Sequence, residues 1–330
     1  MASSDFADTG WLDAVWPIHP FARVIVDNDF AGDPDDMFQL AHHLLSPEVD
    51  VVAVICSHLR EGDRHCPTNS MEVGYKRAAR LADIVRFDNK KALKKGAPGA
   101  LSHRDVPIPS EATQAIIDAA LDPNAQGPLY VTCGGGLTDI ASAYLLRPEI
   151  ASHLTLIWIG GPEYPGLAYP PPGSGNTEYN LAIDPIAAQV VFNDSDIRIW
   201  QVPRNVYRQC MVSRAELRRR LSTCGELGHY LLNELAGIAA SIDEAGDRSW
   251  CPSTYVIGDQ PLVLLTALQS FFEPDPASSD YVIRPVPLLD GEGNPTPNAD
   301  GRPARVYTRV DTRLMFEDMF TKFETVQHAK

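Results

Sequence analysis

The sequence has 330 residues, of which 44% are hydrophobic and 22% are charged. This length allows one large α/β domain or two small ones, each with a substantial core. Lys and Arg number 28 against 43 Asp and Glu, so the formal net charge is −15. Such an acidic balance argues against nucleic acid or an anionic membrane surface as the main partner. No apolar run approaches the roughly 18 residues of a membrane span.

The N-terminus and the cysteines favour a cytoplasmic protein. The segment 1–20 contains no Lys or Arg and no continuous apolar stretch, so it does not resemble a signal peptide. The 6 cysteines are scattered and form no Cys-x-x-Cys pair. This usage is typical of reduced thiols in the cytosol, and it argues against a zinc site built on cysteine.

Segments rich in Val and Ile alternate with helical patterns in the first part of the chain. Strands are predicted at 23–26, 51–57, 129–133, 154–159 and 197–202. Helices are predicted at 35–45, 71–85, 111–121, 137–146 and 185–192. This order predicts an α/β fold with a doubly wound, mostly parallel sheet and helices on both faces. Ligands bind at the carboxyl ends of the strands in such sheets.

The second half of the chain is less regular. Helices are predicted at 213–221, 225–242, 262–268 and 311–323, and a strand pair at 281–288 and 306–310. No linker divides the sequence, so we expect a single domain over 1–330. Its motif-bearing core would cover about 22–270, with the C-terminal strand pair and helix at about 280–325. The Pro- and Gly-rich loop at 160–176 has a length that usually indicates a functional or mobile segment.

The strongest chemical signal follows the first predicted strand. The segment VDNDFAGDPDD at 26–36 contains five acids, which are Asp27, Asp29, Asp33, Asp35 and Asp36. Burying such charges without compensation would cost several kcal/mol. Capping of the next helix by Asp33 or Asp35 explains only one or two of them. An all-oxygen site for Ca²⁺ or Mg²⁺ is therefore predicted, with Asp259, in a turn before a buried helix, as the best distant ligand.

Four segments in this order resemble the nucleoside hydrolase family, whose inosine–uridine-preferring members define it. The family opens with a strand, a DxD and a DD pair that begins a helix; here these are Asp27, Asp29, Asp35 and Asp36. GGGLTDIA at 134–141, NTEYN at 176–180 and GDQPL at 258–262 follow. The acidic loop is two residues longer than in the common pattern. Gly258 also replaces the His of the best-known branch, so the sequence resembles a divergent branch.

The resemblance implies calcium-dependent hydrolysis of the N-glycosidic bond of ribonucleosides to a nucleobase and ribose. Asp35 would take the proton of a metal-bound water, whereas an ungapped match would give this role to Asp33. The implied Ca²⁺ ligands are Asp29, Asp36, Asp259 and the carbonyl of Gly134. The expected substrate contacts are Asp27, His58, Asn176, Glu178, Asn180 and Trp250. Family members are often dimers or tetramers, so a homo-oligomer with a small-molecule nucleoside substrate is expected.

The absence of a His before Asp259 leaves the partner of the departing base open. Candidates are His58, His65, Tyr207, Trp250 and Tyr255. The pair His42–His43 lies inside a predicted helix and is expected to be structural.

Three alternatives to an ordinary nucleoside hydrolase stay open at this point. A magnesium-dependent phosphatase of the haloacid dehalogenase type would also place Asp27 and Asp29 after an apolar strand. It would leave the glycine-rich turn and the segment 176–180 unexplained. A calcium-dependent sugar or nucleoside binder without turnover is compatible with Gly258. The substrate of a hydrolase could also be a modified nucleoside or another furanoside.

Overall fold

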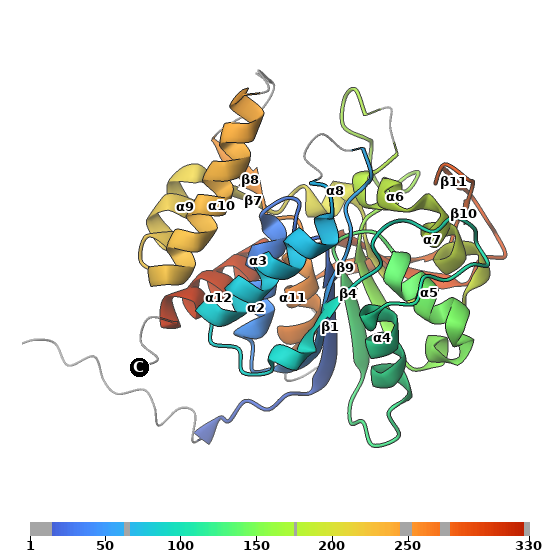
Figure 1. The fold of residues 1–330 in the computed structure, drawn as a ribbon. Helices are drawn as coiled ribbons and strands as arrows, with labels where there is room; N and C mark the ends of the chain where they lie inside the picture. The colour runs from blue at the N-terminus through green and yellow to red at the C-terminus, as the bar shows by residue number, and fades with distance from the viewer. Residues whose placement is uncertain (1–14, 63–66, 175–176, 245–252, 271–277, 327–330) are drawn as a thin grey trace, which may run out of the picture.

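The computed structural model describes residues 15–62, 67–174, 177–244, 253–270 and 278–326. At its centre lies an eight-stranded sheet with the order β3-β2-β1-β4-β5-β6-β12-β9 (Figure 1). The parallel strands are β1 (Ala22–Asn28), β2 (Val49–Cys56), β3 (Leu93–Lys95), β4 (Leu129–Cys133), β5 (Thr155–Ile159), β6 (Arg198–Val202) and β12 (Pro303–Arg309). The edge strand β9 (Asp280–Pro285) pairs antiparallel with β12. The predicted doubly wound, mostly parallel α/β sheet is confirmed.

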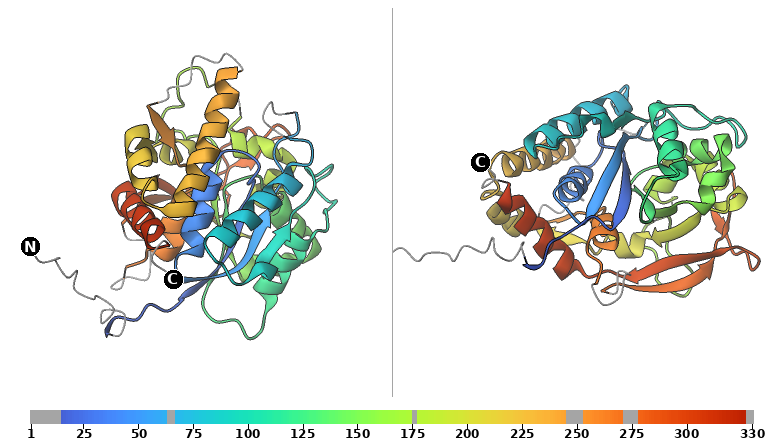
Figure 2. Two further views of the ribbon diagram at one scale, coloured as in Figure 1. Left: turned by 60° about the vertical axis from the view of Figure 1, so that its left-hand side comes forward. Right: turned by 90° about the horizontal axis from the view of Figure 1, so that it is seen from below.

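Helices cover both faces of this sheet (Figures 1 and 2). One face carries α2 (Asp35–Leu44), α3 (Ser70–Ile84), α11 (Pro261–Ala267) and α12 (Thr312–Thr325). The other carries α4 (Glu111–Leu121), α5 (Thr138–Leu146) and α7 (Pro185–Gln189). Helices α9 (Arg214–Leu221) and α10 (Gly225–Glu244) contact α12 from outside, and α10 projects beyond the body in Figure 1. None of the helices described is long and apolar enough to cross a membrane.

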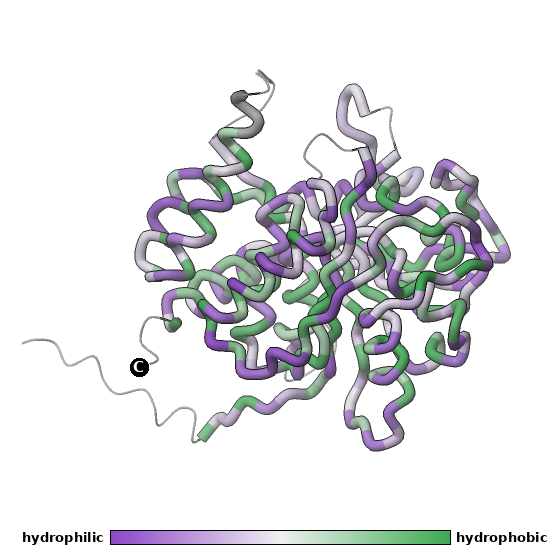
Figure 3. The backbone as a smooth tube through the Cα atoms, viewed as in Figure 1, coloured by the Kyte–Doolittle hydropathy of each residue, from purple (hydrophilic) through white to green (hydrophobic). Residues whose placement is uncertain are grey.

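The central strands are apolar along their whole length because both of their faces are covered. Along β1, Val24 and Val26 join the core on one face of the sheet, whereas Ile25 joins the core on the other. Figure 3 shows hydrophobic segments gathered along the inner strands and hydrophilic ones toward the periphery.

Short elements lie in the connections between the longer strands and helices. They are α6 (Tyr179–Ile183), α8 (Arg204–Tyr207), the antiparallel pair β7 (Met211–Ser213) and β8 (Thr254–Val256), and the antiparallel pair β10 (Leu288–Leu289) and β11 (Pro295–Thr296).

The C-terminal strands differ in place and extent from those expected. They cover 280–285 and 303–309, and β12 pairs parallel with β6, with Arg305 opposite Trp200. The pair therefore extends the main sheet. The edge strand β3 was not expected, since three residues are too short to show a periodic pattern. The helix expected at 185–192 is α7 followed by a π-helical turn, Val190–Asp194.

The strand order reverses between β1 and β4. From β1 the chain moves outward through β2 and β3, and it then returns to add β4, β5 and β6 on the opposite side. In open α/β sheets ligands bind at such a switch point, at the carboxyl ends of the strands. The acidic segment after β1 and the glycine-rich turn after β4 meet there.

Candidate active site

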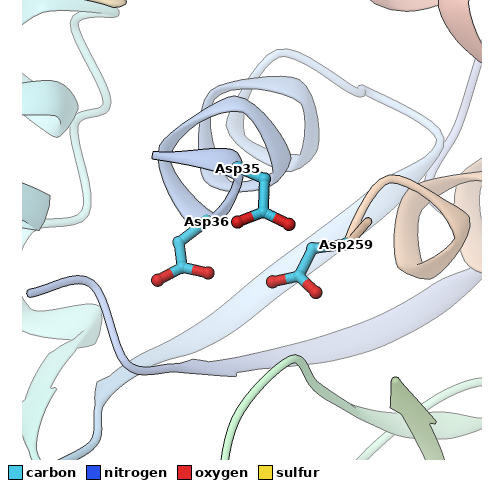
Figure 4. A group of neighbouring side chains, drawn as sticks. All are labelled: Asp35, Asp36 and Asp259. Carbon is cyan, nitrogen blue, oxygen red and sulfur yellow. The ribbon is translucent and has the colours of Figure 1, made fainter. Parts of the chain in front are cut away.

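Three carboxylates converge at the switch point. Asp35 and Asp36 are the first two residues of α2, and Asp259 lies in the turn before α11. Their carboxylate oxygens lie within 4.8 Å of one another, and Figure 4 shows the three side chains converging from these two elements. At the start of α2 the acids also complement the helix dipole.

Burial and mutual repulsion make it unfavourable to ionise these three carboxyl groups together. Asp36 and Asp259 are each 3% exposed, and Asp35 is half-buried. Burial, followed by neighbouring carboxylates, raises the pKa of Asp35 and of Asp36 well above the usual range. Burial also raises the pKa of Asp259 to about 6. Without a cation, ionisation of all three carboxylates is therefore disfavoured, and Asp36 and Asp259 are hydrogen-bonded to each other.

The surroundings of the cluster fit a hard divalent cation. The buried Oδ2 atom of Asp36 has no hydrogen-bond partner among the described residues. A Cβ atom at Gly134 would lie 2.2 Å from Asp259 Oδ2 and 2.5 Å from Asn28 Nδ2, so only glycine allows β4 to end so close. The neighbouring donors are carboxylate and carbonyl oxygens, which suit Ca²⁺ or Mg²⁺ rather than zinc.

The other two acids of the strand end lie at different depths. Asp29 is 5% exposed and lines the cavity described below. Its charge raises the pKa of Asp36, and a Cβ atom at Gly135 would lie 3.1 Å from its Oδ1 atom. Asp27 is completely buried, accepts a hydrogen bond from the hydroxyl of Ser57 and does not line the cavity. Asp27 therefore has a structural role, since it binds Ser57 rather than facing a ligand.

The carboxylates form one wall of a cavity of about 420 Å³. Apolar and aromatic side chains also line this cavity, namely those of Leu59, Ile159, Tyr207, Ile238 and Val256. Cavities of this size, with a few convergent polar groups, are typical of small-ligand sites.

Glu178 and Asn180 line this cavity, and both also hydrogen-bond to groups that surround it. Glu178 Oε2 accepts hydrogen bonds from the backbone N–H groups of Gly161 (2.7 Å) and Leu181 (3.1 Å). Its Oε1 atom accepts one from the hydroxyl of Tyr207 (2.7 Å). Each carboxylate oxygen has further acceptor capacity. The two residues therefore fix the cavity wall whether or not they also contact a sugar.

The carbonyl of Gly134 already has one hydrogen-bond partner. The side-chain amide of Asn180 donates to it at 2.6 Å, and also to the carbonyl of Ile159 at 2.8 Å. Because a carbonyl oxygen has two lone pairs, one stays available to a cation. Metal ligation by Gly134 remains a prediction.

Of the two candidates for the base, Asp35 is the one in the cluster. Asp33 is exposed and accepts a hydrogen bond from the hydroxyl of Tyr255. The same hydroxyl accepts one from the backbone N–H of Asp35 (3.1 Å). The backbone N–H of Gly258 donates to Asp35 Oδ2 (2.9 Å), and a Cβ atom at position 258 would lie 3.2 Å from this oxygen. Gly258 thus orients Asp35.

His58 is the one remaining sequence-predicted residue that the described part of the chain contains. His58 is buried, and its ring nitrogens contact the Leu59 carbonyl and the Thr138 hydroxyl, both at 2.9 Å. It does not line the cavity. A substrate contact would require the ring to leave these bonds. Asn176, Trp250 and His65 lie outside the described residues.

Sequence reasoning missed Arg208 and Ile238, which both line the cavity. Neither belongs to a recognisable motif. Arg208 comes directly after α8, which follows the carboxyl end of β6, so its place relative to the sheet was the only signal that could have found it.

The sheet order and the acidic cavity place the chain among α/β proteins that bind a small ligand at the carboxyl ends of their strands. The family model described as "Inosine-uridine preferring nucleoside hydrolase" matches residues 24–313. The chain belongs to this family.

Curated relatives and solved structures agree with this membership. The chain is 32% identical over 136 residues to the non-specific ribonucleoside hydrolase RihC of Salmonella paratyphi B. This match covers 40% of the chain and 42% of RihC, so it spans less than half of that relative. RihC of Salmonella typhi matches equally.

Two solved structures share the fold over nearly their whole length. The plant nucleoside hydrolase PpNRh1 has a TM-score of 0.68 at 18% identity, over 92% of this chain and 99% of that one. The purine-preferring ribonucleoside hydrolase from Gardnerella vaginalis has a TM-score of 0.67 at 19% identity, over 92% and 98%.

Proposed function

We propose that this chain hydrolyses the N-glycosidic bond of ribonucleosides in a calcium-dependent reaction, with Asp35 as the general base. The observation that carries the proposal is the convergence of Asp35, Asp36 and Asp259 on one cavity at the switch point of the sheet. Family membership and the similarity to RihC support a ribonucleoside as the substrate class.

The charge of the cavity suits this reaction. Glycosidic cleavage passes through an oxocarbenium-like sugar with positive charge at the anomeric carbon. Asp29, Asp36, Asp259 and the carbonyl of Gly134 would hold the ion. When bound, calcium supplies an oxygen-binding centre that fixes the ribose hydroxyls and polarises a water.

Asp35 is suited to accept a proton. A general base works best when its pKa lies near the working pH, and burial raises the pKa of Asp35. The N–H of Gly258 holds Oδ2, which leaves Oδ1 free to face the attacking water. The other acids of the cluster would be occupied in holding the ion.

One alternative is favoured by a specific observation. Gly258 stands where the best-known branch has a His, and no imidazole lines the cavity among the described residues. A calcium-dependent nucleoside binder without turnover is therefore the second candidate. Family membership favours either of these over the phosphatase alternative, and the substrate could still be a modified nucleoside or another furanoside.

The test is reducing-sugar release from a panel of purine and pyrimidine ribonucleosides, with calcium and after its removal. We expect calcium-dependent release, and we expect Asp35→Asn to lower kcat by about 10²- to 10⁴-fold, the usual contribution of a general base. Calcium binding, measured by calorimetry, should persist in this variant.

Asp33→Asn is the matched control within the same cavity and should stay within about tenfold of wild type, since Asp33 is exposed and outside the three-acid cluster. The reverse ranking of the two variants would make Asp33 the base. Calcium and nucleoside binding without any release would favour the binder.

We also propose a cytoplasmic location and a homo-oligomeric state. The buried, unpaired thiols of Cys56, Cys133, Cys210 and Cys224 support a reducing compartment. The oligomer rests on the resemblance to the family alone, and sedimentation equilibrium would test it.

A further inference from the structure

The acidic cavity contains one cationic side chain among the described residues that line it, that of Arg208. This arginine follows α8 directly and is exposed. Within the described part of the chain its guanidinium has no hydrogen-bond or ion-pair partner closer than 4 Å. The charge of Arg208 helps to lower the pKa of Glu163. However, both oxygens of that carboxylate are already bound by Arg204, at 2.9 and 2.6 Å. Arg208 therefore interacts with Glu163 through charge, and among the described residues no hydrogen bond holds its guanidinium.

The surroundings of Arg208 suit a flat heterocycle. The adjoining Tyr207, with Ile238 of α10 and Val256 of β8, contributes apolar surface to the same cavity. The carboxylates of Asp35, Asp36 and Asp259 converge in the same cavity and would take the sugar. A nucleoside that spans the cavity would then direct its base toward the apolar side chains and the guanidinium.

We propose that Arg208 donates hydrogen bonds to N7 and O6 of a 6-oxopurine base, so that inosine- and guanosine-type nucleosides are the preferred substrates. The inference rests on the proposed hydrolase function. A guanidinium carries donors only, in a planar fork, and it matches the two adjacent acceptors of a 6-oxopurine. Adenine replaces O6 by an amino group, which would present a donor to a donor.

The same contact stabilises the departing base. When the C1′–N9 bond breaks, its electron pair goes to the base, and the negative charge spreads to N7 and O6. Arg208 keeps its proton, because a guanidinium is not deprotonated in proteins, and it stabilises this anion by hydrogen bonds and charge. Water adds to C1′ and loses its proton to Asp35, and the released base takes a proton from solvent. Arg208 would thereby assist departure of the base, which a His at position 258 would otherwise do.

The experiment compares kcat/KM of wild type and Arg208→Gln on inosine, adenosine, 7-deazainosine and 4-nitrophenyl riboside, all with calcium. Wild type should prefer inosine over adenosine by about ten- to a hundredfold, the usual discrimination of a bidentate arginine contact. Arg208→Gln should lose most of this preference and should lose activity on inosine by a similar factor. Its loss on 7-deazainosine, which lacks N7, should be smaller.

Two controls separate the possible failures. Activity on 4-nitrophenyl riboside should change little in Arg208→Gln, since 4-nitrophenolate leaves without assistance; an equal loss there would make Arg208 a merely structural residue and overturn the inference. Arg219→Gln, on the exposed side of α9 and outside the cavity, should behave like wild type. An unchanged inosine-to-adenosine ratio in Arg208→Gln would also overturn it. Absence of sugar release from every substrate in wild type would instead overturn the proposed function.

Discussion

The backbone at the end of β4 packs directly against the side chains of the acidic cluster. Gly134 follows this strand directly, and its amide donates to the carbonyl of Asp27 at 3.0 Å. Asn28 donates to Asp259 at 2.6 Å from the strand beside it. No volume for a side chain is left between these groups, so the glycine is required by close approach rather than by its backbone conformation.

Gly134→Ala should damage the site without unfolding the protein. The new methyl group must displace Asp259 or Asn28, because it would lie 2.2 Å from one and 2.5 Å from the other. We expect calcium affinity and kcat/KM to fall by about ten- to a hundredfold, the usual effect of disturbing the support of a metal ligand.

Gly99→Ala is the matched control for this variant. A Cβ atom at position 99 meets nothing within 4 Å, so calcium binding should be unchanged. Calorimetric titration of both variants with calcium measures the difference, and equal affinities would contradict the close approach at Gly134.

At the scale of elements, buried polar contacts align the two helices that carry the cluster. His43 of α2 contacts Thr266 of α11 at 2.9 Å, and His42 contacts Gln260, just before α11, at 2.8 Å. His42 also contacts Asp318 of α12 at 2.7 Å. These bonds fix α2 against α11 and thereby bring Asp35 and Asp36 to Asp259. The histidine pair is structural, as predicted.

The contact of His43 should make the fold sensitive to acid. Burial holds the pKa of His43 well below its usual value, so the ring is neutral in the folded protein. An unfolded chain binds a proton on this histidine below about pH 6.5, so the contribution of His43 to stability is lost as the pH falls below that value.

His43→Gln removes this titration, so its free energy of unfolding should fall less than that of wild type between pH 7.5 and pH 5. Urea unfolding at both pH values measures the two changes. His153→Gln, at an exposed position, should follow wild type. Parallel losses in all three proteins would exclude His43 as the sensitive group.

At the scale of the whole molecule, the acidic cluster links stability to pH in the direction opposite to that of His43. Asp259 has a pKa of about 6 in the folded protein against a reference value of 3.8. The metal-free fold therefore binds more protons than the unfolded chain in this interval, and it loses stability as the pH rises through it. A bound cation would take over the role of the protons.

The stabilisation by calcium should accordingly grow from pH 5 to pH 7. Thermal unfolding of protein dialysed free of metal, with and without added calcium, gives the shift in Tm at each pH. Asp36→Asn should reduce the shift at pH 7, since it removes one of the three converging carboxylates. An equal calcium shift at both pH values would contradict the coupling.

The sequence predicted best where chemistry and local pattern coincide. The acids after β1, the turn at Gly134 and Asp259 each carry a local signal, and the doubly wound sheet could be inferred from the alternation of strands and helices along the chain. Arg208 could not be found, because its role depends on α8 following β6 and not on neighbouring residues. The hydrogen bonds of Glu178 and the parallel pairing of β12 with β6 likewise depend on contacts between distant segments.

The hydrogen bond between Asn28 and Asp259 joins positions 231 residues apart. During synthesis, the acids after β1 emerge early and stay without their distant partner until most of the chain has been made. Cation binding by the complete cluster would therefore be a late event in the life of the nascent protein. A ribosome-bound fragment that ends before Asp259 has an incomplete cluster, so cation binding would report that the chain has been made at least as far as the start of α11.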